Sequence, residues 1–243
     1  MNVTANPGAK PGPPVASRVA LVAGGSGLVG RQLLPLLLDA PEYARVHAIS
    51  RRPLPLEHAR FANRVLRFDA PLETQLKGLV VQDAFCCLGT TLRTAGSQAA
   101  FRAVDHDLVL AFARAAKTAG AERLVVVSSI GADPASNNFY LRVKGETERD
   151  LEALRLRALD ILQPSLLLGM RSAADRRGLE QAAQIAGWLL GPLLMGNWQR
   201  YRPIQAAMVA AAMRGAARSG RLGVTRHNYA GLRRLAGEGS RRR

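Results

Sequence analysis

Residues 18–30 read RVALVAGGSGLVG, a short apolar run that is followed at once by a glycine-rich turn. The apolar residues 19–23 predict a buried β-strand, and the periodic pattern of residues 28–39 predicts a helix after the turn. A strand that leads through glycines directly into a helix is typical of the first unit of a parallel α/β sheet. This stretch therefore decides the fold class in which the rest of the sequence is interpreted.

Three glycines of the turn stand at a spacing that suits a dinucleotide. Gly24 permits a sharp turn, Gly27 lets the backbone approach a pyrophosphate, and Gly30 lets the helix pack closely on the strand. The amides at the helix N-terminus would then bind the anion. The motif can also be aligned from Gly25, and a plain strand-to-helix turn is the alternative interpretation.

Strand and helix patterns alternate from residue 18 to about residue 162. Further strands are expected at residues 46–49, 65–68, 80–87, 124–127 and 159–162, and further helices at residues 101–119, 140–154, 179–190 and 205–217. The sequence therefore predicts an α/β fold, a doubly wound Rossmann parallel sheet with a small C-terminal substrate-binding region from about residue 169.

The length of 243 residues, of which 48% are hydrophobic, suits one domain. We expect a flexible leader at residues 1–17, a single NAD(P)-binding domain at residues 18–220 and a basic C-terminal tail at residues 221–243. The leader lacks the apolar run of a secretory signal. The longest apolar stretch, residues 185–195, is too short for a bilayer, which takes roughly 20 residues. With Trp188 and Trp198 it is expected to line a substrate pocket or form a dimer face, a membrane surface being the least favoured choice.

Two adjacent cysteines, Cys86 and Cys87, exclude a disulfide framework and a CxxC spacing, so a reducing, cytoplasmic location is expected. Buried packing is favoured for both over a reactive thiol. The histidines lack ligand spacing and predict no metal site; they are His47, His58, His106 and His227.

The formal net charge of +16 comes from 34 basic and 18 acidic residues. The arginines are spread along the chain, and the only tight run is residues 241–243. Aromatic residues are few, and no nucleic-acid motif is present. We therefore expect a solvated basic surface with no nucleic-acid partner.

The choice of cofactor is indicated by Arg51 and Arg52, at the end of the second predicted strand. Enzymes that bind NAD usually place an acidic residue there, against the ribose 2′-hydroxyl. Two guanidinium groups instead suit a 2′-phosphate, which predicts NADPH. The alternative is a solvent-exposed pair in an arginine-rich chain.

Tyr140 and Lys144 form a YxxxK motif that places both side chains on one helix face, a single turn apart. A tyrosine phenol has an ordinary pKa near 10, and a neighbouring ammonium lowers it while also reaching the nicotinamide ribose. Ser129, just past the fifth predicted strand, is placed to hydrogen-bond the reacting oxygen of a substrate. The alternative is a core-edge tyrosine beside a surface lysine.

Longer motifs resemble a known family: CCLGTT at residues 86–91, FRAVD at 101–105, SSIGAD at 128–133 and FYLRVKGE at 139–146. The sequence from about residue 18 to residue 217 resembles the atypical branch of the short-chain dehydrogenase/reductase superfamily that includes the Tat-interacting oxidoreductase-like proteins. Gln163 departs from the pattern, in which arginine commonly precedes the proline, and this leaves the substrate pocket less defined than the cofactor site.

This resemblance implies a bound NADPH and assigns further residues to it. Ser26, Gly27, Leu28 and Val29 would lie at the phosphates, Arg51 and Arg52 at the 2′-phosphate, Asp69 near the adenine, Leu88 and Gly89 along the nicotinamide half, and Pro164 to Leu167 by the nicotinamide ring. Some members of the branch are regulators rather than enzymes.

The leading hypothesis is an NADPH-dependent oxidoreductase acting on a small carbonyl or alcohol, with Tyr140 as general acid/base, Lys144 as its electrostatic partner and Ser129 positioning the oxygen. An NADPH-binding regulatory protein without turnover is the principal rival. A sugar-nucleotide epimerase or dehydratase is a third, although such enzymes normally need more C-terminal chain. The sequence leaves the substrate unidentified, and a homodimer or protein partner remains open.

Overall fold

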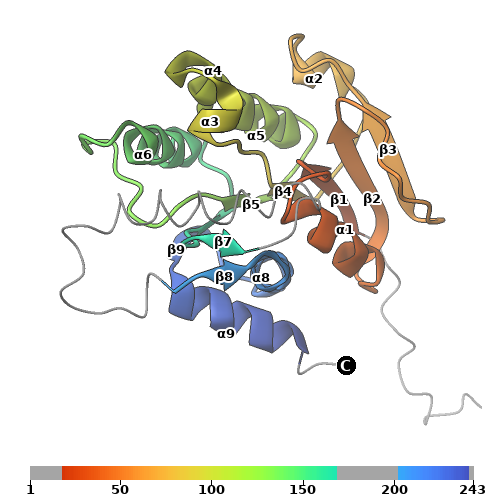
Figure 1. Ribbon diagram of the computed structural model, residues 1–243. Coiled ribbons are helices and arrows are strands. Elements are labelled where there is room, and N and C mark those ends of the chain that lie inside the picture. The colour runs from red at the N-terminus through yellow and green to blue at the C-terminus, as the bar shows by residue number, and fades with distance from the viewer. Residues whose placement is uncertain (1–17, 169–201, 241–243) are drawn as a thin grey trace, which may run out of the picture.

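The computed structural model describes residues 18–168 and 202–240 (Figure 1). Seven strands form one sheet in the order β3-β2-β1-β4-β5-β6-β9, and every neighbouring pair is parallel. The strands are β1 (Arg18–Ala23), β2 (Tyr43–Ser50), β3 (Phe61–Val65), β4 (Asp83–Cys86), β5 (Arg123–Val127), β6 (Ala158–Leu162) and β9 (Gly223–His227). The order reverses between β1 and β4, which confirms the doubly wound Rossmann sheet.

Helices cover both faces of the sheet because alternate side chains of each strand point to opposite sides. Ala20 and Val22 face α1 (Gly30–Leu38), α8 (Ala206–Arg218) and α9 (Tyr229–Ser240). Leu21 and Ala23 face α2 (Leu72–Gln75), α5 (Leu108–Thr118) and α6 (Phe139–Glu152). In Figure 1, α5 and α6 lie above the sheet, and α8 and α9 lie below it.

The remaining described elements are short and lie near the ends of the strands. They are α3 (Leu92–Ala95), α4 (Gln98–Arg102), the π-helix η1 (Ala103–Asp107), and the paired strands β7 (Leu167–Leu168) and β8 (Ile204–Gln205). The single helix expected at residues 101–119 is therefore three elements, with η1 in its middle.

The prediction of the third strand was wrong in position, because β3 is Phe61–Val65 rather than residues 65–68. This edge strand is polar in its centre. The Asn63 amide donates to the carbonyl oxygen of Ala48 at 3.1 Å and to Ser50 Oγ at 2.8 Å. A search for an apolar run misses a strand whose central residue is held by hydrogen bonds to its neighbour.

The prediction of a basic tail from residue 221 was also wrong where the structure describes it. Strand β9 pairs with β6, and α9 packs on α8 through the buried Leu232 and Leu235. Two residues of β9 have acidic partners inside the fold: Arg226 contacts Glu148, and His227 lies 2.8 Å from an oxygen of Asp160. Such partners, distant in sequence, are invisible to a local reading of charge.

Several expectations concern residues outside the described ranges. These are the leader at residues 1–17, the apolar stretch at 185–195 with its helix at 179–190, most of the substrate-binding region from residue 169, and residues 241–243. Among the described helices, none is long and apolar enough to cross a membrane.

A cluster of charged and polar side chains links the N-terminal ends of β1 and β4. Arg18 donates to both carboxylate oxygens of Asp83, at 2.8 and 2.7 Å, and Tyr43 donates to the same carboxylate at 2.8 Å. The phenol is almost fully buried, and this burial, followed by the Asp83 charge, raises its pKa well above the ordinary value. Tyr43 is therefore held as a neutral donor that joins β2 to β4.

Candidate cofactor and catalytic site

The candidate site lies where five parallel strands end at one edge of the sheet. Because β1, β2, β4, β5 and β6 all run in the same direction, the loops that follow them meet at this edge. These loops carry the residues that the sequence singled out, beginning with the glycine turn after β1. In open parallel sheets a ligand binds at the point where the strand order reverses, here between β1 and β4.

The glycine turn passes so close to the loop after β4 that side chains are excluded. Gly24 has φ +80°, and a Cβ there would lie 2.5 Å from the carbonyl oxygen of Cys87. A Cβ on Gly30 would lie 2.2 Å from the carbonyl oxygen of Gly24, so the first residue of α1 packs directly on the turn. No side chain caps the start of this helix at Val29, and an anion bound there would meet the positive end of the α1 dipole. The cradle fits the pyrophosphate of a dinucleotide.

Arg51 and Arg52 follow β2 on a turn whose backbone is held by hydrogen bonds with the side chains of Ser50 and Asn63. Ser50 Oγ donates to the carbonyl oxygen of Arg52 at 2.7 Å, and Asn63 Oδ1 accepts from the backbone amide of Leu54 at 2.8 Å. The side chains of Arg51 and Arg52 are exposed. The strand β3 thus holds the backbone of the turn while the guanidinium groups extend into solvent.

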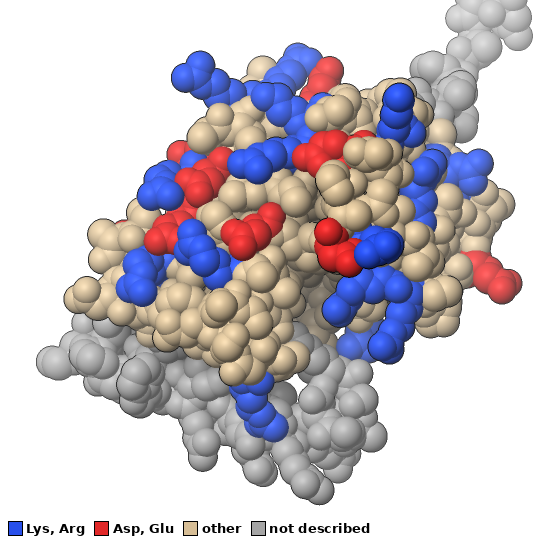
Figure 2. Space-filling view, turned by 90° about the horizontal axis from the view of Figure 1, so that it is seen from above, with Lys and Arg blue, Asp and Glu red and all other residues tan. Residues whose placement is uncertain are grey.

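Figure 2 shows how the charged side chains are distributed over one face of the protein. Basic and acidic side chains alternate over much of this face, and basic side chains also gather in one group beside a hollow. Asp69, expected near the adenine, is exposed and forms an ion pair with Arg67 at 2.9 Å. The hydrogen bonds from Arg67 are the main cause that lowers the pKa of this carboxyl.

The residues expected along the nicotinamide half follow β4 and β6. Leu88 is half-buried and Gly89 is exposed; a Cβ on Gly89 would lie 3.4 Å from Asp105 Oδ1 and 4.0 Å from Lys144 Nζ. Pro164 is buried, and its carbonyl oxygen accepts from the amide of Ile130 at 3.0 Å. Leu167 lies in β7. The structure thus brings Gly89 next to Lys144. It also brings the loop after β6 next to the loop that follows β5 and carries Ser129, which we call the serine loop.

The tyrosine and lysine lie on α6, one turn apart. The helix begins after Asn138, whose side chain accepts from the amide of Leu141 at 3.2 Å. Tyr140 is half-buried, with its ring centroid 5.5 Å from that of Phe101, whereas Lys144 is buried. The burial of Lys144 contradicts the alternative in which it is a surface lysine.

The serine loop is packed tightly on the same helix. A Cβ on Gly145 would lie 2.2 Å from the peptide that joins Asp133 to Pro134, so only glycine allows α6 to approach this loop. The amide of Asp133 also donates to the carbonyl oxygen of Leu141 at 3.1 Å. Ser129 Oγ, farther back in the loop, lies 3.3 Å from the carbonyl oxygen of Ile130. This weak bond leaves the hydroxyl able to turn to another acceptor.

Lys144 is paired with a residue to which the sequence analysis gave no role. Its Nζ lies 2.6 Å from Oδ1 of Asp105, which is almost completely buried in η1. Burial is the largest single influence and lowers the pKa of Lys144, but the Asp105 carboxylate, with smaller contributions from Tyr140 and Cys86, outweighs it, and the pKa is raised above the ordinary value. The lysine is therefore a stable cation beside the tyrosine.

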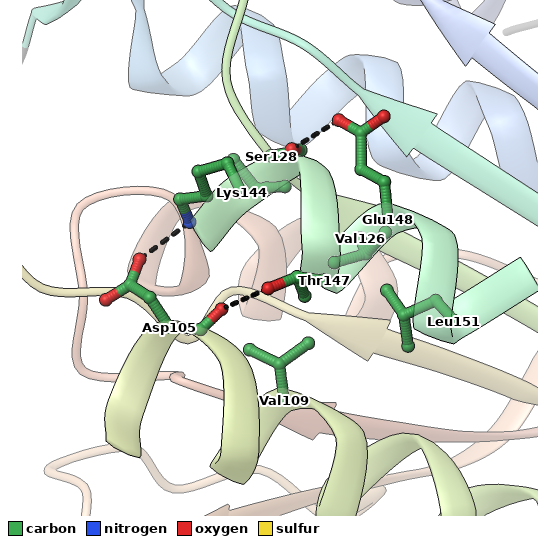
Figure 3. A pocket seen from close by; sticks show the side chains of 9 residues that line it. Asp105, Val109, Val126, Ser128, Lys144, Thr147, Glu148 and Leu151 are labelled. Carbon is green, nitrogen blue, oxygen red and sulfur yellow. Dashed lines mark hydrogen bonds and ion pairs between the residues drawn. The ribbon is translucent and has the colours of Figure 1, made fainter. Parts of the chain in front are cut away.

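A second buried carboxylate, Glu148, lies one turn farther along α6 (Figure 3). It accepts from Ser128 Oγ at 2.5 Å, from the Gln163 amide at 2.9 and 3.1 Å, and from Arg226 Nε at 3.0 Å. Between Glu148 and Lys144 lies a cavity of about 10 Å³, room for roughly one water molecule. The neutral Gln163 thus shares this carboxylate with an arginine from β9.

Sequence reasoning missed Asp105, Glu148 and Arg226 for identifiable reasons. Asp105 follows Val104 in a helical pattern of apolar residues, and the only local sign of a functional role is a charged residue beside that pattern.

Cys86 and Cys87 agree with the packing interpretation. Burial raises the pKa of the Cys86 thiol to about 12, and Cys87 Sγ lies 3.6 Å from the sulfur of Met213.

Comparison with known proteins agrees with this geometry. Residues 24–168 match the protein family described as NAD(P)H-binding. The chain is 35% identical over 193 residues to "Protein FMP52, mitochondrial" of Coccidioides immitis, covering 73% of this chain and 78% of that protein. It is 36% identical over 201 residues to "Protein HTATIP2" of Rattus norvegicus, covering 81% of this chain and 80% of that protein.

A solved structure, MoeE5 in complex with UDP-glucose and NAD, shares the fold with a TM-score of 0.64. The superposition covers 90% of this chain and 81% of that one at 18% sequence identity. At this identity the likeness concerns the arrangement of strands and helices.

Proposed function

The chain belongs to the NAD(P)H-binding family of atypical short-chain dehydrogenase/reductase proteins that includes FMP52 and HTATIP2, and from this premise we propose that it is an NADPH-dependent oxidoreductase acting on a small carbonyl or alcohol. The observation that carries the proposal is the buried, cationic Lys144, one helical turn after Tyr140 and beside the loop after β4. The glycine cradle of β1 opens at the same edge of the sheet.

The proposed chemistry divides the reduction between the cofactor and three side chains. When bound, NADPH supplies the hydride that reaches the carbonyl carbon. The phenol of Tyr140 donates its proton to the carbonyl oxygen, and the Lys144 ammonium stabilises the phenolate that remains. The hydroxyl of Ser129 donates a hydrogen bond to the same oxygen and so positions it. In the direction of oxidation, the phenolate accepts the alcohol proton.

For the cofactor, we propose that the turn after β1 holds the phosphates through Gly24, Ser26, Gly27, Leu28, Val29 and Gly30. Support comes from the exclusion of side chains at Gly24 and Gly30 and from the uncapped start of α1. Arg51 and Arg52 would bind the 2′-phosphate, since the described turn carries two exposed guanidinium groups on a fixed backbone. Asp69, Leu88, Gly89, Pro164 and Leu167 complete the proposed adenine and nicotinamide contacts.

The decisive test replaces the proton donor. Tyr140→Phe should abolish turnover of a panel of small aldehydes and ketones, followed by NADPH absorbance, because the variant lacks only the phenolic proton. Its affinity for NADPH, measured by calorimetry, should stay within about threefold of the wild type. Tyr229→Phe, on α9 at the other face of the sheet, is the matched control and should retain full activity.

Two outcomes would contradict the proposal. Equal rates for the wild type and Tyr140→Phe would remove the tyrosine from the mechanism. Tight NADPH binding without turnover of any substrate by the wild type would favour the rival hypothesis, a regulatory protein controlled by its cofactor.

A cytoplasmic location remains part of the proposal, although the FMP52 relatives carry the word mitochondrial in their names.

A further inference from the structure

The strand β3 ends the sheet on one side, and its outer edge is unpaired within the described ranges (Figure 1). Leu66, the residue after β3, donates its amide to the carbonyl oxygen of Ser50 in β2 at 2.9 Å. Because the backbone groups of alternate residues point the same way, those of Arg64 also face β2, whereas those of Asn63 and Val65 face outward. No hydrogen bond from a described residue reaches these outward groups. They are therefore open to a further strand.

The side chains on one face of this edge are basic. Arg64 lies in register with Ile49, which packs in the core on the α5 side of the sheet. Arg45 and His47 lie on the same face of β2, since side chains alternate along a strand. Among the described residues, no carboxylate lies within ion-pair distance of Arg45 or Arg64. We call Arg45, His47 and Arg64 the basic face.

The histidine in this group reports the unbalanced charge around it. The pKa of His47 is lowered to about 4, first by burial and then by the charges of Arg64 and Arg45. Its Nδ1 is buried and has no hydrogen-bond partner among the described residues. No carboxylate contributes to this shift. The described part of the fold therefore leaves the positive charge of the basic face without a counter-charge.

The other face of the same edge is apolar. Phe61, at the start of β3, packs against the core on the α1 side of the sheet. Val65, four residues later on that face, is 52% exposed. A strand added beside β3 would therefore have basic side chains next to one of its faces and an exposed valine next to the other.

We propose that the outer edge of β3 is a docking site for an extended segment of another protein in which acidic and apolar side chains alternate. The segment adds a strand to the sheet through backbone hydrogen bonds to Asn63 and Val65. Its acidic side chains lie beside Arg64 on the basic face, and its apolar side chains pack on Val65. This surface is separate from the proposed reaction and does not depend on it.

The charge of the chain argues for a partner of different composition. A second copy, with the same net charge of +16, would bring its own arginines to the basic face, and like charges on neighbouring strands repel. Residues 1–17 contain no acidic residue that could pair with Arg64. A nucleic acid would engage the arginines and leave the outward N–H and C=O groups of β3 unpaired. The alternating acidic segment satisfies both the charges and the backbone.

The direct test is amide hydrogen exchange of the full chain, followed by NMR, with and without a synthetic peptide in which glutamate and valine alternate. In the free protein, the amides of Asn63 and Val65 should exchange rapidly, and those of Ala62 and Arg64 slowly, because the latter pair with β2. A saturating amount of peptide should slow exchange at Asn63 and Val65 severalfold. Two control peptides carry the same residues, one with glutamates and valines in separate blocks and one with lysine in place of glutamate, and both should bind more weakly.

Two variants separate the charge from the backbone. Arg64→Glu reverses the charge nearest the peptide and should raise its dissociation constant by about fivefold or more. Val65→Pro removes one outward N–H and keeps the hydrogen bonds to β2, so it should weaken binding by about fivefold. Arg114→Glu, an exposed position on α5, has the same change in net charge and should bind the peptide like the wild type. Thermal unfolding verifies that each variant is folded.

A peptide methylated on alternate backbone amides tests the pairing even if a variant does not fold. Methyl groups on the amides that face β3 should abolish binding, whereas methyl groups on the other amides should leave it intact. The inference is overturned if the alternating peptide does not bind, as expected when the arginines only protect the edge from aggregation. It is equally overturned if the block peptide binds as tightly, if Arg114→Glu weakens binding as much as Arg64→Glu, or if a DNA duplex displaces the peptide at equal concentration.

Discussion

Replacing Arg51 by alanine should weaken NADPH binding and leave NADH binding almost unchanged. The two cofactors differ by the 2′-phosphate, and the turn after β2 carries guanidinium groups in place of a carboxylate. Because Ser50 and Asn63 hold the backbone of this turn, removal of the Arg51 side chain should not move it. The change in affinity then reports the interaction of one guanidinium with one phosphate.

The size of the effect follows from the exposure of the arginine. A hydrogen bond to a charged group contributes about 1.5 to 3 kcal/mol, which corresponds to roughly tenfold to a hundredfold in the dissociation constant. Arg51 is exposed, so solvent screening favours the lower end, about tenfold. The double variant Arg51→Ala/Arg52→Ala should lose more, and the preference of the wild type for NADPH should shrink in 1 M salt, where the screening length falls to about 3 Å.

The assay is titration calorimetry of each protein with NADPH and with NADH at two salt concentrations. Arg45→Ala is a suitable control, because this exposed arginine lies on β2, the strand that leads into the turn, six residues before Arg51. It should bind both cofactors like the wild type. The reasoning is refuted if the wild type binds NADH as tightly as NADPH, or if Arg51→Ala weakens both cofactors equally.

Two further predictions concern stability and charge. Tyr43→Phe removes the buried hydroxyl that donates to Asp83, so it should reduce the free energy of unfolding by about 1.5 to 3 kcal/mol. Thermal unfolding should show this as a midpoint lower by several degrees, and an unchanged midpoint would contradict this account. The protein should bind a DNA duplex and an RNA strand no more tightly than micromolar at physiological salt, because basic and acidic side chains alternate over much of the face in Figure 2. A submicromolar dissociation constant in an anisotropy titration with either nucleic acid would contradict this prediction.

Much of the candidate site lies in local sequence. The glycine turn, the arginines after β2 and the YxxxK pair are each defined by residues within a few positions of one another, and their elements follow from periodicity. The edge where these segments meet follows from the parallel strand order. What local sequence omits is the pairing of Lys144, since Asp105 lies 39 positions earlier in the chain.

By itself, the sequence determined the doubly wound fold, the strand-to-helix glycine turn and the positions of Tyr140 and Lys144 on one helix face. These features depend on backbone preferences and on apolar periodicity, which are local properties. Only the tertiary structure decided that β3 is the polar segment Phe61–Val65 and that residues after 221 add a seventh strand. It also decided that Asp105 and Glu148 are buried carboxylates of the site. The physical reason is that a buried charge is stabilised by partners distant in sequence, which only the folded chain brings within hydrogen-bond distance.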